Sequence, residues 1–323
     1  MSLTDHHNLA RLPSGLIHPL TCCFTHEEHV DEWSDRGLPD PSELAGIFGR
    51  DLPHGTVVTF SFEAGNRLKV DIENEFEGFS DSREYCLDTH TIHQGDMSVS
   101  QKGNGTGKKL LRNIIEGGRG LGCIALMVNA SSDNGGYTWA RAGIPLLDSD
   151  YIKKEARSEI GFRLAVISPF IPEDVYSQAA QLNAEDSIYN IHDLASLDCD
   201  LSIFFAGDYL QPNSGYVWGS FLSMYQQKYK TRFACAANPR EMAEETLEKD
   251  MEKYRATAEH FLDRKMPYTL GRFLFTGVSY SGYLFFDDKK AMDRVRQYVG
   301  GFPSEAPNAT RTVTPTFLGI SVY

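Results

Sequence analysis

The sequence has no long run of apolar residues, and this absence argues against a membrane protein or a secreted one. No stretch approaches the roughly 20 apolar residues that a membrane-spanning helix needs. The N-terminal segment contains histidine, asparagine, proline and aspartate where a secretory signal has an apolar core. We therefore expect a cytoplasmic protein that makes no contact with a membrane.

Cysteine is also sparse. The six cysteines show neither the spacing of a disulfide framework nor that of a zinc site. Cys22 and Cys23 are adjacent, and the others are scattered along the chain. His26 and His29 lie three residues apart with no third ligand in view, so we predict no metal site. Reduced thiols agree with a cytoplasmic protein.

Basic residues are in the minority. The chain has 31 lysines and arginines against 44 aspartates and glutamates, which gives a formal net charge of −13. This balance disfavours a nucleic-acid partner, because nucleic-acid-binding surfaces are basic. It favours a cationic substrate or partner, although solubility alone also accounts for a negative charge.

Two common phosphate-binding motifs are absent, although glycines gather in the segment 101–109, which reads QKGNGTGKK. A Walker A loop requires glycine where Lys102 stands and a hydroxyl residue directly after its Gly-Lys pair. A dinucleotide fingerprint reads G-x-G-x-x-G, whereas Gly103, Gly105 and Gly107 alternate as G-x-G-x-G. Both interpretations therefore fail.

The residues after these glycines predict a helix and then a buried strand. Leu110, Leu111, Ile114 and Ile115 recur at the spacing of one helix face. The apolar run 123–128 (CIALMV) is typical of a strand buried on both faces. A glycine loop that ends at a helix N-terminus presents free backbone N–H groups, and this favours the binding of a phosphate.

The order of loop, helix and strand resembles the GCN5-related N-acetyltransferase superfamily over residues 97–145. The segment 102–111 is similar to that family's pyrophosphate loop, in which Arg/Gln-x-x-Gly-x-Gly/Ala precedes an amphipathic helix. Asn134 then matches the family's asparagine-containing turn after the strand. The segment 139–144 (WARAGI) matches its closing aromatic residue, three further residues and glycine.

The resemblance implies an acyltransferase that moves an acetyl or other acyl group from coenzyme A to an amine by direct attack. Acetyl-coenzyme A is the implied co-substrate, and the negative chain favours a cationic amine. The implied cofactor site combines the end of the strand before the loop, the loop and the later turn. Its residues are Met97, Val99, Lys102, Gly103, Asn104, Gly105, Thr106, Gly107, Lys108 and Asn134.

Two positions depart from the family pattern. Lys102 replaces the usual arginine or glutamine, which keeps a positive charge but loses the planar fork of arginine. Trp139 stands where many members have a tyrosine that protonates the departing thiolate, and an indole cannot act as that acid. Tyr137 is the alternative acid, although a shift of two residues along a helix turns a side chain well away.

The resemblance also places a general base in the segment before the loop. His90 and His93 both lie there, three residues apart, so on a strand they point to opposite faces. We expect His93 to act as the base, because a histidine side chain titrates near neutral pH. Glu84, Asp88 and Asp96 are alternative bases.

We expect an α/β (α+β) protein with a mixed central sheet of the acyl-CoA N-acyltransferase type and a large, mostly helical C-terminal extension. Residues 15–145 would form the core and residues 146–323 the extension. The segment 272–286 predicts a strand hairpin that completes the core sheet. The alternative function is a catalytically inactive module that keeps the fold for binding or interaction.

Further elements follow from local patterns. The segments 56–63 and 67–76, separated by Gly65-Asn66, predict a β-hairpin. Residues 85–93 predict another strand before the loop. The segments 151–166 and 239–262 predict helices, the second with proline in its first turn.

Overall fold

The computed structural model describes residues 21–26, 28–100, 104–130, 135–201, 216–234, 238–263 and 267–303. The chain divides into two compact units. The first comprises the described parts of Met1–His90, Asp96–Cys123 and Arg296–Tyr323, and the second those of Thr91–Gly95 and Ile124–Val295. Parallel and antiparallel strand pairs both occur, together with many helices, so the predicted mixed α/β class is confirmed.

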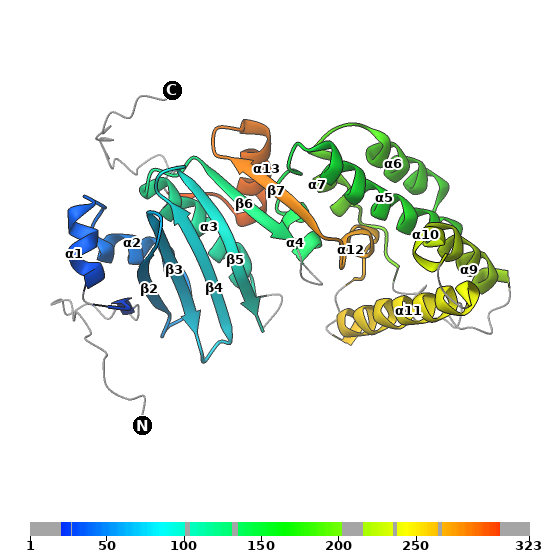
Figure 1. The fold of residues 1–323 in the computed structure, drawn as a ribbon, viewed down its shortest axis with the longest axis horizontal. Coiled ribbons are helices and arrows are strands. Elements are labelled where there is room, and N and C mark those ends of the chain that lie inside the picture. Colours follow the sequence, from blue (N-terminus) through cyan, green and yellow to red (C-terminus); the bar gives the residue numbers. More distant parts are fainter. Residues whose placement is uncertain are drawn as a thin grey trace. The chain divides into compact units, whose positions relative to one another are not determined.

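The first unit contains four paired strands, of which β2, β3 and β4 are labelled in Figure 1. They are β1 (Thr21–Phe24), β2 (Val57–Glu63), β3 (Arg67–Asn74) and β4 (Phe79–Cys86). β1 pairs with β2 in parallel, whereas β2, β3 and β4 pair antiparallel. The predicted hairpin is confirmed, since β2 and β3 are joined by a turn in which Gly65 and Asn66 have φ angles of +80° and +57°.

Side chains alternate between the two faces of β2, β3 and β4, as the pleat of a strand requires. One face is buried, and its residues include Val58, Phe60, Leu68, Val70, Ile72 and Tyr85. Helix α2 (Pro41–Phe48) covers this face, because the ring of Phe48 contacts the rings of Phe60 and Tyr85. The opposite face carries mainly polar residues.

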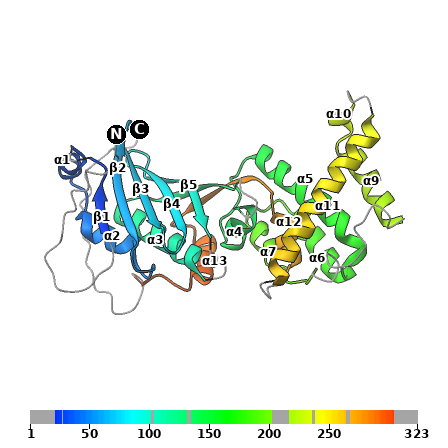
Figure 2. The ribbon, with the colours of Figure 1, turned by 90° about the horizontal axis from the view of Figure 1, so that it is seen from below.

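Helix α3 (Thr106–Gly120) lies beside α2 on the buried face of β2–β4 (Figure 2). The predicted apolar stripe of α3 is confirmed, since Leu110, Leu111, Ile114 and Ile115 are all buried. Gly117 allows the close contact between the two helices, because a Cβ built there would lie 2.2 Å from Cε1 of Phe48. Helix α1 (Glu28–Asp35) completes the helices before β2.

The strand predicted over residues 85–93 is wrong in its extent. β4 ends at Cys86, and β5 (Thr91–Val99) begins after a turn in which His90 has a φ of +52°. The backbone N–H of Leu87 donates to the carbonyl of Asn66 beside the last β3–β4 pair, and residues 87–90 then form the turn. Asp88, which lies in this turn, is a residue that favours turns over strands, so the run contained a local sign of the break.

The second unit contains the first residues of β5, followed by β6 (Ala125–Ala130) and β7 (Tyr280–Phe285). β5 and β6 are parallel, and β6 and β7 are antiparallel. The predicted buried strand starts two residues later than expected. Ile124, within the predicted run, is 56% exposed, so the run is not buried throughout.

Both predicted long helices, 151–166 and 239–262, are confirmed in the second unit as α5 and α11. The elements are α4 (Gly135–Arg141), α5 (Asp150–Ile167), η1 (Ser168–Phe170), α6 (Glu173–Ala184), α7 (Asn190–Ala195), α9 (Tyr216–Lys228), α10 (Lys230–Phe233), α11 (Pro239–Asp263) and α12 (Leu270–Phe275). A last helix, α13 (Lys289–Val299), runs from this unit into the first. Among the described residues, no helix is long and apolar enough to cross a membrane.

The hairpin predicted over 272–286 is wrong in its first half, which forms helix α12 instead of a strand. Thr269 caps this helix, accepting a hydrogen bond from the backbone N–H of Arg272. The buried guanidinium of Arg163 donates to the carbonyl oxygens of Phe273 and Thr276 at 2.9 and 2.5 Å. These contacts satisfy the C-terminal end of α12 and outweigh the strand preference of its aromatic residues.

Candidate functional site

The start of α3 has the geometry of an anion site. Gly105 is its N-cap residue, with a φ of +76° that favours glycine, and no side chain caps the helix there. The N–H groups of Lys108 and Lys109 both donate to the carbonyl of Gly105, at 3.0 and 3.1 Å. The first turn of any helix leaves backbone N–H groups without intrahelical acceptors, and the helix dipole adds positive potential at that end.

The described residues leave space beside this helix start. A Cβ built at Gly105 or Gly107 meets no atom of the described residues within 4 Å. Gly107 also lacks the positive φ that would require glycine. Glycine in a helix is less stable than alanine by about 1 kcal/mol, so neither local conformation nor internal packing explains the residue at 107. A ligand that approaches the backbone closely would explain it.

Positive charge borders the same turn. Lys108 is exposed, and its Nζ lies 4.7 Å from the centre of the Tyr298 ring, which faces it from α13. Further along α3, the guanidinium of Arg112 forms an ion pair with Asp51 at 2.8 Å. Lys108 itself lies in the first turn of α3, so its charge can add to the attraction for an anion.

The remaining residues predicted to bind the cofactor divide into two groups. Met97 and Val99 lie near the end of β5, in the first unit, and both are half-buried. Asn104 and Thr106 flank Gly105 at the start of α3, where Asn104 is exposed and Thr106 is buried. Lys102, Gly103 and Asn134 lie outside the described residues.

His93, the predicted base, lies on β5 in the second unit. It is half-buried, and its Nε2 lies 3.1 Å from the hydroxyl of Thr91 on the same face of the strand. The parallel register joins 91–93 to 125–127, and His93 pairs with Met127 in its last position. Both strands continue beyond this pair within the same unit, so His93 stands where their pairing ends.

Tyr137 and Trp139 lie on the short helix α4, also in the second unit. Trp139 is buried, with 5% of its surface exposed. Tyr137 is half-buried, and the guanidinium of Arg272 lies 4.6 Å from the centre of its ring. A Cβ built at Gly136 would lie 2.3 Å from the carbonyl oxygen of Val278, so α4 packs tightly in place.

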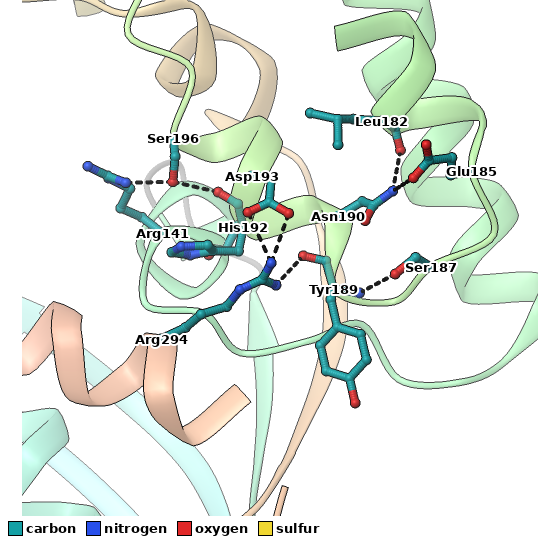
Figure 3. Close-up of polar contacts among 11 residues, drawn as sticks. Arg141, Leu182, Glu185, Ser187, Tyr189, Asn190, His192, Asp193, Ser196 and Arg294 are labelled. Atoms are coloured by element: carbon teal, nitrogen blue, oxygen red, sulfur yellow. Dashed lines mark hydrogen bonds and ion pairs between the residues drawn. The ribbon is translucent and has the colours of Figure 1, made fainter. Parts of the chain in front are cut away.

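A polar network that the sequence did not indicate fixes α4 against α7 (Figure 3). Nδ1 of His192 lies 3.3 Å from the carbonyl oxygen of Ala140, and Arg141 donates to the hydroxyl of Ser196 at 2.5 Å. Burial lowers the pKa of His192, and the nearby guanidinium of Arg294 lowers it further. A neutral His192 therefore acts in this network as a structural hydrogen-bonding group.

Arg294 extends the same network from α13 (Figure 3). Its Nη2 donates to both carboxylate oxygens of Asp193, at 3.0 and 2.8 Å, and its Nη1 donates to the carbonyl of Tyr189 at 2.7 Å. These contacts hold α7, and through it the helix that carries Tyr137. No local sequence signal identifies the network, because its members come from three separate segments.

A buried ion pair lies on β4 in the first unit. Asp81 and Arg83 occupy the buried face of the strand, where neither side chain is exposed to solvent, and they pair with each other. Burial raises the pKa of Asp81 to about 7, although the Arg83 guanidinium opposes this shift. Burial lowers the pKa of Arg83. In the alternating pattern of β4, Asp81 and Arg83 stand at positions where apolar residues are expected. This departure from the pattern was the sequence signal that could have revealed the pair.

The predicted site residues thus fall in both units. The first holds Met97, Val99 and the helix start at 104–108, and the second holds His93 and Tyr137. Within the described residues, no group of three or more histidine, cysteine or acidic side chains could hold a metal ion. No family model, no curated protein and no solved structure matches this chain.

Proposed function

We propose that this protein is an acyltransferase that uses acetyl-coenzyme A, or a related acyl-coenzyme A, to acylate an amine. The observation that carries the proposal is the start of α3, where Gly105 provides no side-chain cap and Gly107 follows in the first turn with no described atom near a built Cβ. Gly46 in α2 has similar space around it, so the proposal depends on the position of Gly107 at a helix start, where a pyrophosphate can approach the backbone closely. The resemblance to the GCN5-related N-acetyltransferase superfamily over 97–145 supplies the reaction.

The chain's own residues would bind and orient the co-substrate. Backbone N–H groups at the start of α3 would hold the phosphates, and Lys108 would add positive charge. Met97 and Val99, by resemblance, would bind the pantetheine arm through their backbone. Acetyl-coenzyme A, when bound, supplies a thioester whose acyl carbon can accept an amine.

Two side chains would move protons. If Nε2–H of His93 donates to the Thr91 hydroxyl, Nδ1 keeps the lone pair that accepts a proton from the attacking amine. The C–N bond forms as the C–S bond breaks, and the electron pair leaves on sulfur. Tyr137 would then donate a proton to the thiolate, while Arg272 over its ring limits the positions that the side chain adopts.

Calorimetry with coenzyme A tests the role of Gly107 through a matched pair of variants. Gly107→Ala should stabilise α3 by up to about 1 kcal/mol and weaken coenzyme A binding at least tenfold, because a methyl group would enter the phosphate surface. Gly46 in α2 is the control, since it is also helical and faces open space. Gly46→Ala should stabilise the fold equally and leave binding unchanged.

If the wild-type protein does not bind coenzyme A, or if Gly107→Ala binds as well as wild type, the proposal is wrong. The inactive binding module remains the second candidate, because a buried Trp139 stands where the family has its acid. Binding of acetyl-coenzyme A without turnover of any amine would favour that candidate. Turnover that falls moderately in Tyr137→Phe and strongly in His93→Gln would favour the enzyme.

A further inference from the structure

An asparagine–glycine pair stands at the start of α3, where Asn104 is exposed and Gly105 is the N-cap residue. In such a pair, the backbone nitrogen of the second residue can attack the side-chain amide of the asparagine and expel ammonia. Glycine favours this reaction, because it has no Cβ to obstruct the attack and its backbone reaches many conformations. Among the asparagines that the structure describes, Asn104 is the one that glycine follows. The pair is therefore a candidate site of spontaneous deamidation.

The local structure leaves the attacking nitrogen accessible. The carbonyl of Gly105 accepts hydrogen bonds from the N–H groups of Lys108 and Lys109, at 3.0 and 3.1 Å. Within the described part of the chain, no backbone carbonyl accepts a hydrogen bond from the N–H of Gly105 itself. A Cβ built at Gly105 meets no described atom within 4 Å, so packing against described residues does not prevent a ring from closing there. The helix thus holds the carbonyl of Gly105 and leaves its nitrogen to react.

Two other asparagines of the structure are protected by comparison. Asn113 is buried inside α3, where its side-chain amide donates to two backbone carbonyls at 3.0 and 2.7 Å. Asn129 is exposed, but it lies in the paired strand β6 and precedes Ala130. Its side-chain oxygen also accepts a hydrogen bond from the hydroxyl of Ser281 at 2.9 Å. Neither residue combines an exposed amide with a following glycine, so both serve as internal references.

We infer that Asn104 deamidates spontaneously, and that this reaction closes the anion site at the start of α3. The Gly105 nitrogen loses its proton and bonds to Cγ of Asn104, while the bond from Cγ to the amide nitrogen breaks and releases ammonia. The product is a cyclic succinimide, and water opens it at either carbonyl to leave aspartate or isoaspartate. The overall change is the hydrolysis of an amide to a carboxylate, so water is the only co-reactant.

Deamidation places a carboxylate beside the first turn of α3. A negative charge at a helix N-terminus is favourable, so an aspartate there stabilises the helix. The same charge repels a phosphate from that turn. The start of α3 then resembles that of α2, where the carboxylate of Asp40 accepts hydrogen bonds from two backbone N–H groups. The modification itself does not depend on the proposed function, whereas its effect on coenzyme A rests on it.

Peptide mapping by mass spectrometry tests the modification. Trypsin cleaves after Lys102 and Lys108, so the peptide between them contains Asn104 as its one asparagine. We expect this peptide to gain the mass of deamidation when the folded protein is incubated, relative to fresh protein. The gain should be faster in mildly alkaline than in mildly acidic buffer, because the attacking nitrogen must lose its proton. Asn113 and Asn129 should stay intact over the same period. The inference is overturned if Asn104 stays intact, or if it converts no faster than Asn129.

Calorimetry with coenzyme A tests the consequence. Aged wild type should bind coenzyme A about two- to fivefold more weakly than fresh wild type, since one negative charge is added near the phosphates. Asn104→Asp imitates one product, so without ageing it should show the weaker binding and melt at a higher temperature than fresh wild type. Asn104→Gln is the matched control, because its longer side chain closes a ring much more slowly. Its affinity should not fall on ageing.

The outcomes separate this inference from the proposed function. Conversion of Asn104 in a protein that does not bind coenzyme A when fresh would keep the modification and reject the acyltransferase. Conversion with unchanged coenzyme A affinity would overturn the closing of the anion site. An equal loss of affinity in aged wild type and aged Asn104→Gln would overturn it too, because the loss would come from another residue, such as Asn134 before Gly135.

Discussion

Two helices of the same unit begin in opposite ways. At the start of α2, the carboxylate of Asp40 accepts hydrogen bonds from the backbone N–H groups of Ser42 and Glu43, at 2.8 and 3.2 Å. At the start of α3, Gly105 has no side chain to offer, and no described atom lies within 4 Å of a Cβ built there. A side chain of the chain itself therefore caps the first turn of α2, whereas no cap from a side chain of Gly105 exists at the first turn of α3.

This difference separates stability from binding. An N-cap such as Asp40 contributes about 1 kcal/mol to folding and has no reason to affect a ligand elsewhere. A helix that has glycine at its N-cap position lacks this contribution of a capping side chain to stability. The same unit thus contains one helix start that is capped by its own side chain and one to which the proposed function assigns a ligand.

The largest expected effect is a change of stability with pH, and it comes from the buried carboxyl of Asp81 in the same unit. The pKa of Asp81 is raised from 3.8 to about 7 on folding, mainly by burial. The folded chain therefore holds this proton where the unfolded chain releases it, and stability falls as pH rises between these values. The loss is a few kcal/mol, at about 1.4 kcal/mol per pKa unit.

Urea unfolding at a series of pH values measures this loss of stability. Asp81→Asn has no proton to bind at this position, so its stability deficit relative to wild type should shrink as pH rises. A deficit that stays constant between pH 4 and pH 7 would contradict the assignment. The coenzyme A affinity of the folded variant should not change. Asp81 would then, like Asp40, contribute to stability and not to binding.

The next effect concerns Gly105 itself. Gly105→Val forces a β-branched residue into a left-handed conformation and should destabilise the protein by about 1–2 kcal/mol. It should also weaken coenzyme A binding about a hundredfold or more, because the added side chain would keep the phosphates from the backbone N–H groups. Calorimetry and thermal melting report the two effects separately.

Gly37 provides the control for backbone strain. It has a φ of +63° and, like Gly105, nothing within 4 Å of a built Cβ. Gly37→Val should show a similar loss of stability and unchanged coenzyme A affinity. Equal losses of affinity in both variants would mean that strain, not the phosphate surface, explains the result.

Removal of the α2 cap should have a smaller effect, on stability alone. Asp40→Ala leaves two backbone N–H groups without their acceptor and should lower the free energy of unfolding by about 1 kcal/mol. Urea unfolding measures this change. If Asp40→Ala also weakened coenzyme A binding, the distinction between the two helix starts would fail.

The smallest effect concerns an exposed charge. Lys108→Met should weaken coenzyme A binding about two- to fivefold, and less at high salt, because an exposed ion pair is worth little and is screened. Lys249, exposed on α11, is the control, and Lys249→Met should leave binding unchanged. Identical salt dependence in wild type and Lys108→Met would remove Lys108 from the phosphate site.

The elements that the sequence predicted correctly are those with strong local periodicity. The β2–β3 hairpin has an alternating pattern and a Gly-Asn turn, and α3 has its apolar stripe of leucine and isoleucine. Helix α13 was missed, although Asp288 caps it and Met292, Val295 and Val299 follow at helical spacing. That signal was present in the sequence and available to local analysis.

The sequence by itself determined the glycine loop, the helix after it and the strand alternation, because each depends on residues a few positions apart. Only the tertiary structure decided that 270–275 is helical, since the contacts from Arg163 come from far along the chain. Only it decided that a Cβ at Gly107 would meet no described atom within 4 Å, whereas one at Gly117 would meet the ring of Phe48. Glycines look alike in a sequence, and only the distances to their neighbours in space tell a packing residue from one that leaves room for a ligand.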